Sequence, residues 1–153
     1  MTWKSRVPAA IDALVALWSA SPVLAGIVHD GPLPLDSADL EALTVGYDGG
    51  DNGTASEGTL VQAGMAVKPD REQFAVSCLI AVLNGAGNVR AARTRAFELL
   101  SAASEILASD KTLGGIALDA SVQDVSLSQQ QVADGGALVQ ILFTVAVDAF
   151  TEV

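Results

Sequence analysis

The chain has 153 residues, enough for one domain that buries a core without disulfide bonds or metals. It carries 8 Lys and Arg residues against 18 Asp and Glu residues, and the net charge of −10 disfavours binding to nucleic-acid backbones and to anionic membranes. Half of the residues are hydrophobic and only 17% are charged, a balance that favours a subunit of an assembly over a monomer.

The sequence predicts a cytosolic chain that does not cross a membrane. Pro8 and Asp12 interrupt what would be the apolar region of a signal peptide. No apolar run reaches the roughly 18 to 20 residues needed to span a bilayer. Cys78 is the only cysteine, and its place in an apolar run favours a small buried side chain over a reactive thiol.

The N-terminal part of the chain predicts one helix and two strands. The helix covers about residues 6–19, because Leu14 and Trp18 fall on one apolar face and Pro8 suits a first helical turn. A short strand over residues 24–29 ends in the turn Asp30-Gly31-Pro32. A second strand is predicted over residues 42–47.

A long acidic loop is predicted over about residues 48–58. Its glycines and acids raise the question of a calcium site, but a calcium-loop reading that begins at Asp48 places Gly50 and Thr59 where ligands are required. The default interpretation is a solvated loop that a partner orders on binding. A further strand is expected over residues 59–67.

The middle of the chain predicts a central strand followed by the longest helix. Both faces of residues 73–83 are largely apolar, so this strand is expected to be covered on both sides. A helix over about residues 88–109 follows, with Asn88 as its N-cap. The glycines between the two elements resemble a dinucleotide fingerprint, but Arg90 occupies the position of the third glycine, which disfavours nucleotide binding.

Three arginines lie in the first half of this helix. Arg90 and Arg93 are expected to be neighbours on one exposed face, and Arg95 to point elsewhere. Two interpretations stay open: a solvated helix face, or a surface that forms salt bridges with an acidic neighbour, including the acidic loop of another copy. The candidate interface residues are therefore Asp48, Asp51, Glu57, Arg90, Arg93 and Arg95.

The C-terminal third predicts an antiparallel hairpin. Residues 116–127 alternate between apolar and polar positions, and Asp124 with Val125 shifts the phase, which indicates a bulge or a bend. Residues 128–136 are expected to form the connection. Residues 137–151 have one unbroken apolar face and one polar face, as in a strand with one exposed side.

The residue types needed for catalysis are scarce. His29 and Cys78 are single and lie in different predicted strands, so neither has a partner for nucleophilic catalysis or for a metal site of the usual kind. Motifs for phosphate binding, metalloprotease chemistry and paired-cysteine chemistry are absent. The chain is therefore expected to be no enzyme, with no catalytic, cofactor-binding or metal-binding residues.

These elements predict an α+β domain over residues 1–153, with a mixed, mainly antiparallel sheet and two main helices. The whole chain resembles the tail-terminator (tail-completion, neck) proteins of long-tailed bacteriophages, in particular those of actinobacteria. The turns Asp30-Gly31-Pro32, Val45-Gly46 and Leu113-Gly114-Gly115 are the most distinctive parts. The sequence segments that carry the resemblance are VPAAIDALVALWSAS, VLAGIVHDGP, LTVGYDG, REQFAVSCLIAVLNG, RAARTRAFELLSAASEILASDKTLGG and GGALVQILFTVAVDAF.

The resemblance implies a structural virion protein of the tail or neck, assembled in the host cytoplasm. Such a protein packs its helices on one face of the sheet and forms a ring, usually of six copies, on the head-proximal end of the tail tube. The ring stops tube growth, offers a docking surface to the head-completion or stopper protein, and lets DNA pass without specific binding. The alternatives are a stopper or another neck or tail-tube subunit and, outside the virion, a small acidic ligand-binding or accessory domain.

Overall fold

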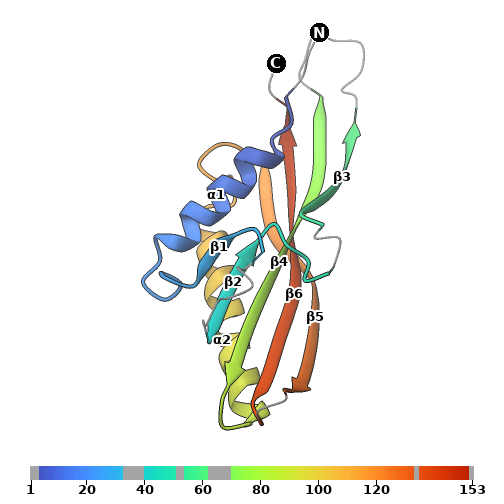
Figure 1. Cartoon of the computed structure of the whole chain (residues 1–153). Helices are drawn as coiled ribbons and strands as arrows, with labels where there is room; N and C mark the ends of the chain where they lie inside the picture. The colour runs from blue at the N-terminus through green and yellow to red at the C-terminus, as the bar shows by residue number, and fades with distance from the viewer. Residues whose placement is uncertain (1–3, 33–39, 51–53, 62–69, 133–134, 152–153) are drawn as a thin grey trace.

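The computed structural model describes residues 4–32, 40–50, 54–61, 70–132 and 135–151. Figure 1 shows a long, twisted sheet with two helices on one of its faces, which confirms the predicted α+β class and the packing of both helices on one side. The elements in chain order are α1 (Val7–Ser19), β1 (Val28–Asp30), β2 (Glu41–Val45), β3 (Ser56–Val61), β4 (Arg71–Asn84), α2 (Val89–Ser109), β5 (Asp119–Gln131) and β6 (Ala137–Phe150).

The sheet is built around β4, as the sequence predicted. Its strand order is β1-β2-β4-β6-β5, and β3 pairs with β4 on the side where β2 also pairs. Strands β4 and β6 pair along all 14 residues, from Arg71 opposite Phe150 to Asn84 opposite Ala137. All pairs are antiparallel except β1 with β2, so the sheet is mixed but mainly antiparallel.

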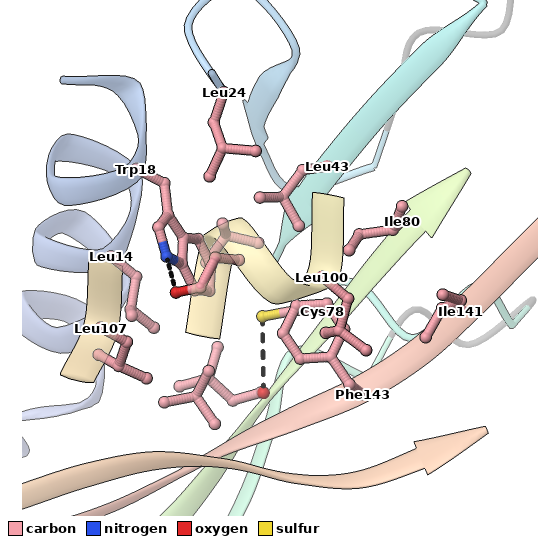
Figure 2. Packing of buried hydrophobic residues seen from close by; sticks show 14 of the residues in the cluster. Leu14, Trp18, Leu24, Leu43, Cys78, Ile80, Leu100, Leu107, Ile141 and Phe143 are labelled. Carbon is pink, nitrogen blue, oxygen red and sulfur yellow. Dashed lines mark hydrogen bonds between the residues drawn. The ribbon is translucent and has the colours of Figure 1, made fainter. Parts of the chain in front are cut away.

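The core lies between the sheet and the two helices (Figure 2). Every second residue of β4 and β6 points into it, the period of 2 that strand geometry imposes. Trp18 of α1 contacts both α2 and the sheet: its Nε1 donates a hydrogen bond to the Ala103 oxygen of α2 at 3.0 Å, and its ring meets Phe143 of β6 edge-on, with the ring centroids 6.2 Å apart. The largest fully buried side chains include Trp18, Phe143, Leu14, Leu24, Leu43, Ile80, Leu99, Leu107 and Ile141.

Local signals at the ends of elements are confirmed. Asn88 caps α2, because its Oδ1 accepts a hydrogen bond from the Ala91 amide at 3.0 Å. The pairing of β5 with β6 shifts between Gln123 and Ser126, and Asp124 has a positive φ of 53°. The phase shift in the sequence is therefore a β-bulge.

Several strand boundaries differ from the predicted ones, most of all in β1 and β5. The first strand is Val28–Asp30 rather than residues 24–29, because turn hydrogen bonds from the amides of Leu24 and Ala25 to the Ser21 oxygen continue the chain after α1. Strand β5 runs on to Gln131 because its glutamines pair with the start of β6, so part of the predicted connection at residues 128–136 is strand.

The predicted acidic loop at residues 48–58 is shorter than expected, because β3 begins at Ser56. Gly58 suggested a loop, but a Cβ at this position would overlap with the Cβ and backbone of Phe74. Glycine is therefore the residue that lets β3 lie close against β4. The second half of the predicted strand at residues 59–67 lies outside the described residues.

The expectation that the central strand is covered on both sides is wrong for most of its length. The side chains of β4 that face the helices are buried, but Gln73 on the opposite face is exposed and Ala75 and Ser77 are only half-buried. Leu79 is buried on that face, where it lies against Gly49. The sheet therefore has one covered face and one largely open face.

Candidate functional site

The predicted interface residue Arg95 is engaged within its own chain. Its Nε lies 2.6 Å from Oε2 of Glu41 and its Nη2 lies 3.2 Å from Oε1, so two hydrogen bonds tie α2 to β2. Its Nη1 also contacts Glu98 at 3.3 Å. The hydrogen bond that Arg95 donates to Glu41 is the main reason that the pKa of Arg95 is raised. Arg95 is thus part of the packing of α2 against the sheet.

Of the other two arginines, Arg93 contacts β5. Arg93 is half-buried and donates a hydrogen bond from Nη1 to Oε1 of Gln129 at 2.8 Å. Arg90 is exposed, and neither side chain forms a salt bridge with another described residue. Two cationic groups without an ion pair in the described part of the chain therefore lie at the N-terminal end of α2, and one of them, Arg93, contacts the last strand of the sheet.

The predicted acidic partners are not gathered beside these arginines. Asp48 is half-buried, and its Oδ1 accepts a hydrogen bond from the Gly50 amide at 2.8 Å, a local turn contact. Glu57 is exposed on β3, which β4 and β6 separate from β5. Asp51 lies outside the described residues. Within one copy, the structure does not bring the six candidate residues into a single site.

The open face of the sheet carries an acidic cleft that the sequence did not single out. The cleft has a volume of about 350 Å³. The alternation of the last two strands did place Asp119 and Asp148 on wet faces, but only the register shows that these two acids lie directly opposite each other. The polar side chains that line the cleft are Glu57, Gln73, Asp119, Ser121, Gln123, Asp124 and Asp148.

Like charges opposite each other on neighbouring strands are unfavourable, and Arg71 offsets this pair. The Arg71 guanidinium binds the Asp148 carboxylate in a two-point contact, with Nε 2.8 Å from Oδ1 and Nη2 against Oδ2. Hydrogen bonding from Arg71 is the main cause that lowers the pKa of Asp148. Arg71 is the only Lys or Arg in strands β1 to β6, and its contact with Asp148 neutralises its charge.

Replacing Arg71 by methionine should make the stability of the fold change less as the pH is lowered. Because the pKa of Asp148 is lowered in the folded state, the contact stabilises the protein above the unfolded pKa of about 3.9 and is lost as the pH falls through the folded pKa. We expect a lower urea midpoint for Arg71→Met than for the wild type at pH 7 and converging midpoints below about pH 4. A difference that stays constant with pH would assign the effect to the hydrocarbon stem of Arg71.

Cys78 is a packing residue, as predicted. Its side chain is fully buried in the core, and burial raises the pKa of its thiol to about 12. We expect no reaction of the native protein with a disulfide reagent at pH 8, because the thiolate is the reactive species. One equivalent of thiol should react once the chain is unfolded in urea. Stoichiometric reaction without denaturant would show that the strands around Cys78 open readily.

The described residues offer no other chemical centre. They contain no group of three or more His, Cys, Asp or Glu side chains placed to hold a metal ion. Among the helices that the structure describes, none is long and apolar enough to cross a membrane. The features that remain are surfaces: the acidic open face and the arginine-bearing end of α2.

Comparisons with known proteins add little to this description. No protein-family model matches the sequence, and no curated protein matches it. A chain in a solved structure, the virion of a native gene transfer agent particle, aligns over 91% of this chain and 94% of its own length with 10% sequence identity and a TM-score of 0.47. Similarity of this size is too low to carry a functional conclusion.

Proposed function

We propose that the chain is a structural virion protein, a tail terminator whose copies form a ring on the head-proximal end of a phage tail tube. The ring stops tube growth, provides the docking surface for the head-completion or stopper protein, and lets the genome pass. The protein takes no part as an enzyme. The assignment is supported by the resemblance of sequence segments along the whole chain to tail-terminator proteins. The low content of charged residues and the net charge of −10 also support it.

The observation that carries the proposal is the difference between the two faces of the sheet. The helices cover one face, and the described part of the other face presents mostly small, polar or acidic side chains. Its one base, Arg71, is paired with Asp148. A channel for DNA needs a wall without free cations, because each unpaired Lys or Arg attracts a phosphate and releases counterions. In the proposed ring, the open face therefore lines the channel.

The arginines of α2 agree with this orientation. They belong to α2, on the helix-covered side of the sheet, where Arg95 pairs with Glu41 of β2 and Arg93 bonds to Gln129 of β5. With the open face turned inward, α2 lies away from the DNA. The acids of the open face come mainly from β5 and β6, so the acidic residues 30–57 contribute less to the channel than the sequence suggested.

A stopper or a tail-tube subunit is the second candidate. These proteins are expected to carry a longer β-hairpin arm. Strands β5 and β6 are 13 and 14 residues long, but β6 pairs with β4 along its whole length, so this hairpin is part of the sheet and gives no support to the alternative. A small ligand-binding domain is less well supported, because the clefts found on the described residues are open surface grooves rather than enclosed apolar pockets.

The proposal can be tested with growing tail tubes. Purified protein added to a polymerising preparation of the matching tail-tube subunit should cap one end and shorten the final tubes, as measured in negatively stained micrographs. The same amount of protein unfolded beforehand serves as the control. Tubes of unchanged length with no density at either end would contradict termination, whereas incorporation along the whole tube would favour a tube subunit.

A further inference from the structure

Strand β5 is an edge strand that lacks the usual protection. It is the last strand in the sheet order, and its 13 residues give it a length of about 43 Å. Soluble proteins usually protect such an edge with Lys, Pro, short length or a bulge, because unpaired backbone groups recruit another strand. β5 contains no Lys, Arg or Pro, and residues 125–131 carry no charge. The bulge at Asp124 is its one protective feature.

Apolar side chains continue from this edge to the outer surface of α2. Val125 is 49% exposed and Leu127 is 40% exposed on β5, and Phe97 is 39% exposed on α2. A groove of about 470 Å³ lies between the two elements, lined by Leu100, Ser101, Ser104, Glu105, Ala108, Val122 and Val125. Together, the β5 edge, the groove and Phe97 form a continuous surface, which we call the β5 surface.

Charge indicates what covers the β5 surface. Arg93 contacts Gln129 at this edge, and Arg90 precedes it by three residues on α2; neither forms an ion pair with another described residue. Residues 7–67 contain no Lys or Arg, and the strands formed within this segment, β1, β2 and β3, all lie on the far side of β4 from β5. Asp30 and Glu57 are exposed there. The β1–β3 side of the sheet is therefore acidic, and the opposite side lies near two guanidinium groups that form no ion pair with a described residue.

We infer that the β5 surface binds the acidic β1–β3 side of a second copy of this chain. The contact is head-to-tail, because it joins two different surfaces, and repeated contacts of this kind close into a ring if the rotation between copies allows it. The uncharged edge of β5 supplies backbone hydrogen bonds. Apolar contact area comes from Val125, Leu127 and Phe97. The positive charges of Arg90 and Arg93 fix the orientation of the acidic partner surface. This inference rests on the proposed function, because it identifies the contact that would join neighbouring subunits of the proposed ring.

Two blocked variants test the contact in solution. Val125→Lys/Leu127→Lys places charges on the β5 surface, and Asp30→Lys/Glu57→Lys reverses the acidic side. By sedimentation equilibrium, the wild type should associate with increasing concentration, and each variant alone should stay monomeric. An equimolar mixture should form heterodimers, because one unblocked surface of each kind remains. Ala16→Lys on the outer surface of α1 controls for added charge and should associate like the wild type.

The mixture distinguishes this geometry from the alternatives. If the β5 surface paired with itself, Asp30→Lys/Glu57→Lys would still dimerise, and that result would overturn the inference. A wild type that stays monomeric up to millimolar concentration would overturn it as well. Circular dichroism and a melting curve check that each variant folds, and Ser128→Lys, at an exposed position, gives a second way to block the edge. None of these outcomes depends on tail length, so the ring contact can fail while termination stands.

Discussion

Replacing Trp18 by alanine should lower the free energy of unfolding by about 3–5 kcal/mol, the range for removing a large buried aromatic side chain. Trp18 has no exposed surface and holds α1 against both α2 and the sheet. The substitution leaves a cavity between Ala103 and Phe143, and it removes the one described side-chain hydrogen bond between the two helices. Urea denaturation followed by circular dichroism measures the loss.

Two matched variants separate the contributions. Trp18→Phe keeps most of the buried area and loses the hydrogen bond to the Ala103 oxygen, which contributes about 0.5–1.5 kcal/mol. Val23→Ala truncates a side chain that is 55% exposed and should change stability by no more than about 0.5 kcal/mol. If Trp18→Ala were as mild as Val23→Ala, α1 would not be an integral part of the core.

Adding bases to the open face of the sheet should make the virion retain its DNA. In Asp119→Lys/Gln123→Lys, each copy presents two cations in the cleft where the wild type presents none that is unpaired. If six copies each contact at least one phosphate, the affinity of the channel for duplex DNA should fall by about 10³-fold or more between 50 and 200 mM salt. DNA ejection in vitro should therefore be slow at low salt and recover at high salt.

The control for this prediction is Asp119→Asn, which removes a negative charge without adding a base. It should eject DNA at nearly the wild-type rate, because phosphate binding requires a cation. Micrographs should show normal heads and tails for both variants. If the lysine variant ejected DNA at the wild-type rate at every salt concentration, the open face would not line the channel. This result would contradict the proposed orientation of the subunits in the ring.

The sequence predicted the features that depend on neighbouring residues. The apolar stripe of α2, including Ala92, Ala96 and Leu99, was visible from the period of a helix, and Asn88 from its position just before it. The change of phase at Asp124 predicted the bulge. The polar faces of the last two strands were also correct, because alternation by two residues separates a buried face from an exposed one.

Features that depend on distant pairing could not be predicted. Nothing near Arg95 indicates that Glu41, 54 residues away, is its partner. The acidic cleft arises only because the register places Asp119 opposite Asp148 and brings Glu57 to the same face. Gly58 was assigned to a loop because glycine is common in loops. Its actual role is to allow close contact with Phe74, which composition does not reveal. The sequence therefore pointed to residues 48–58 and to the arginines as interface residues, and it did not reveal the cleft, whose acids lie mostly on β5 and β6.

Deletion of the protein from the phage or prophage that encodes it tests the central claim most directly. Electron micrographs of the lysate should show filled heads without tails, together with free tails much longer than the wild-type length, because nothing stops the tube or joins it to the head. Expression of the wild-type chain in trans should restore virions of normal length. Tails of normal length joined to heads in the absence of the protein would contradict the account.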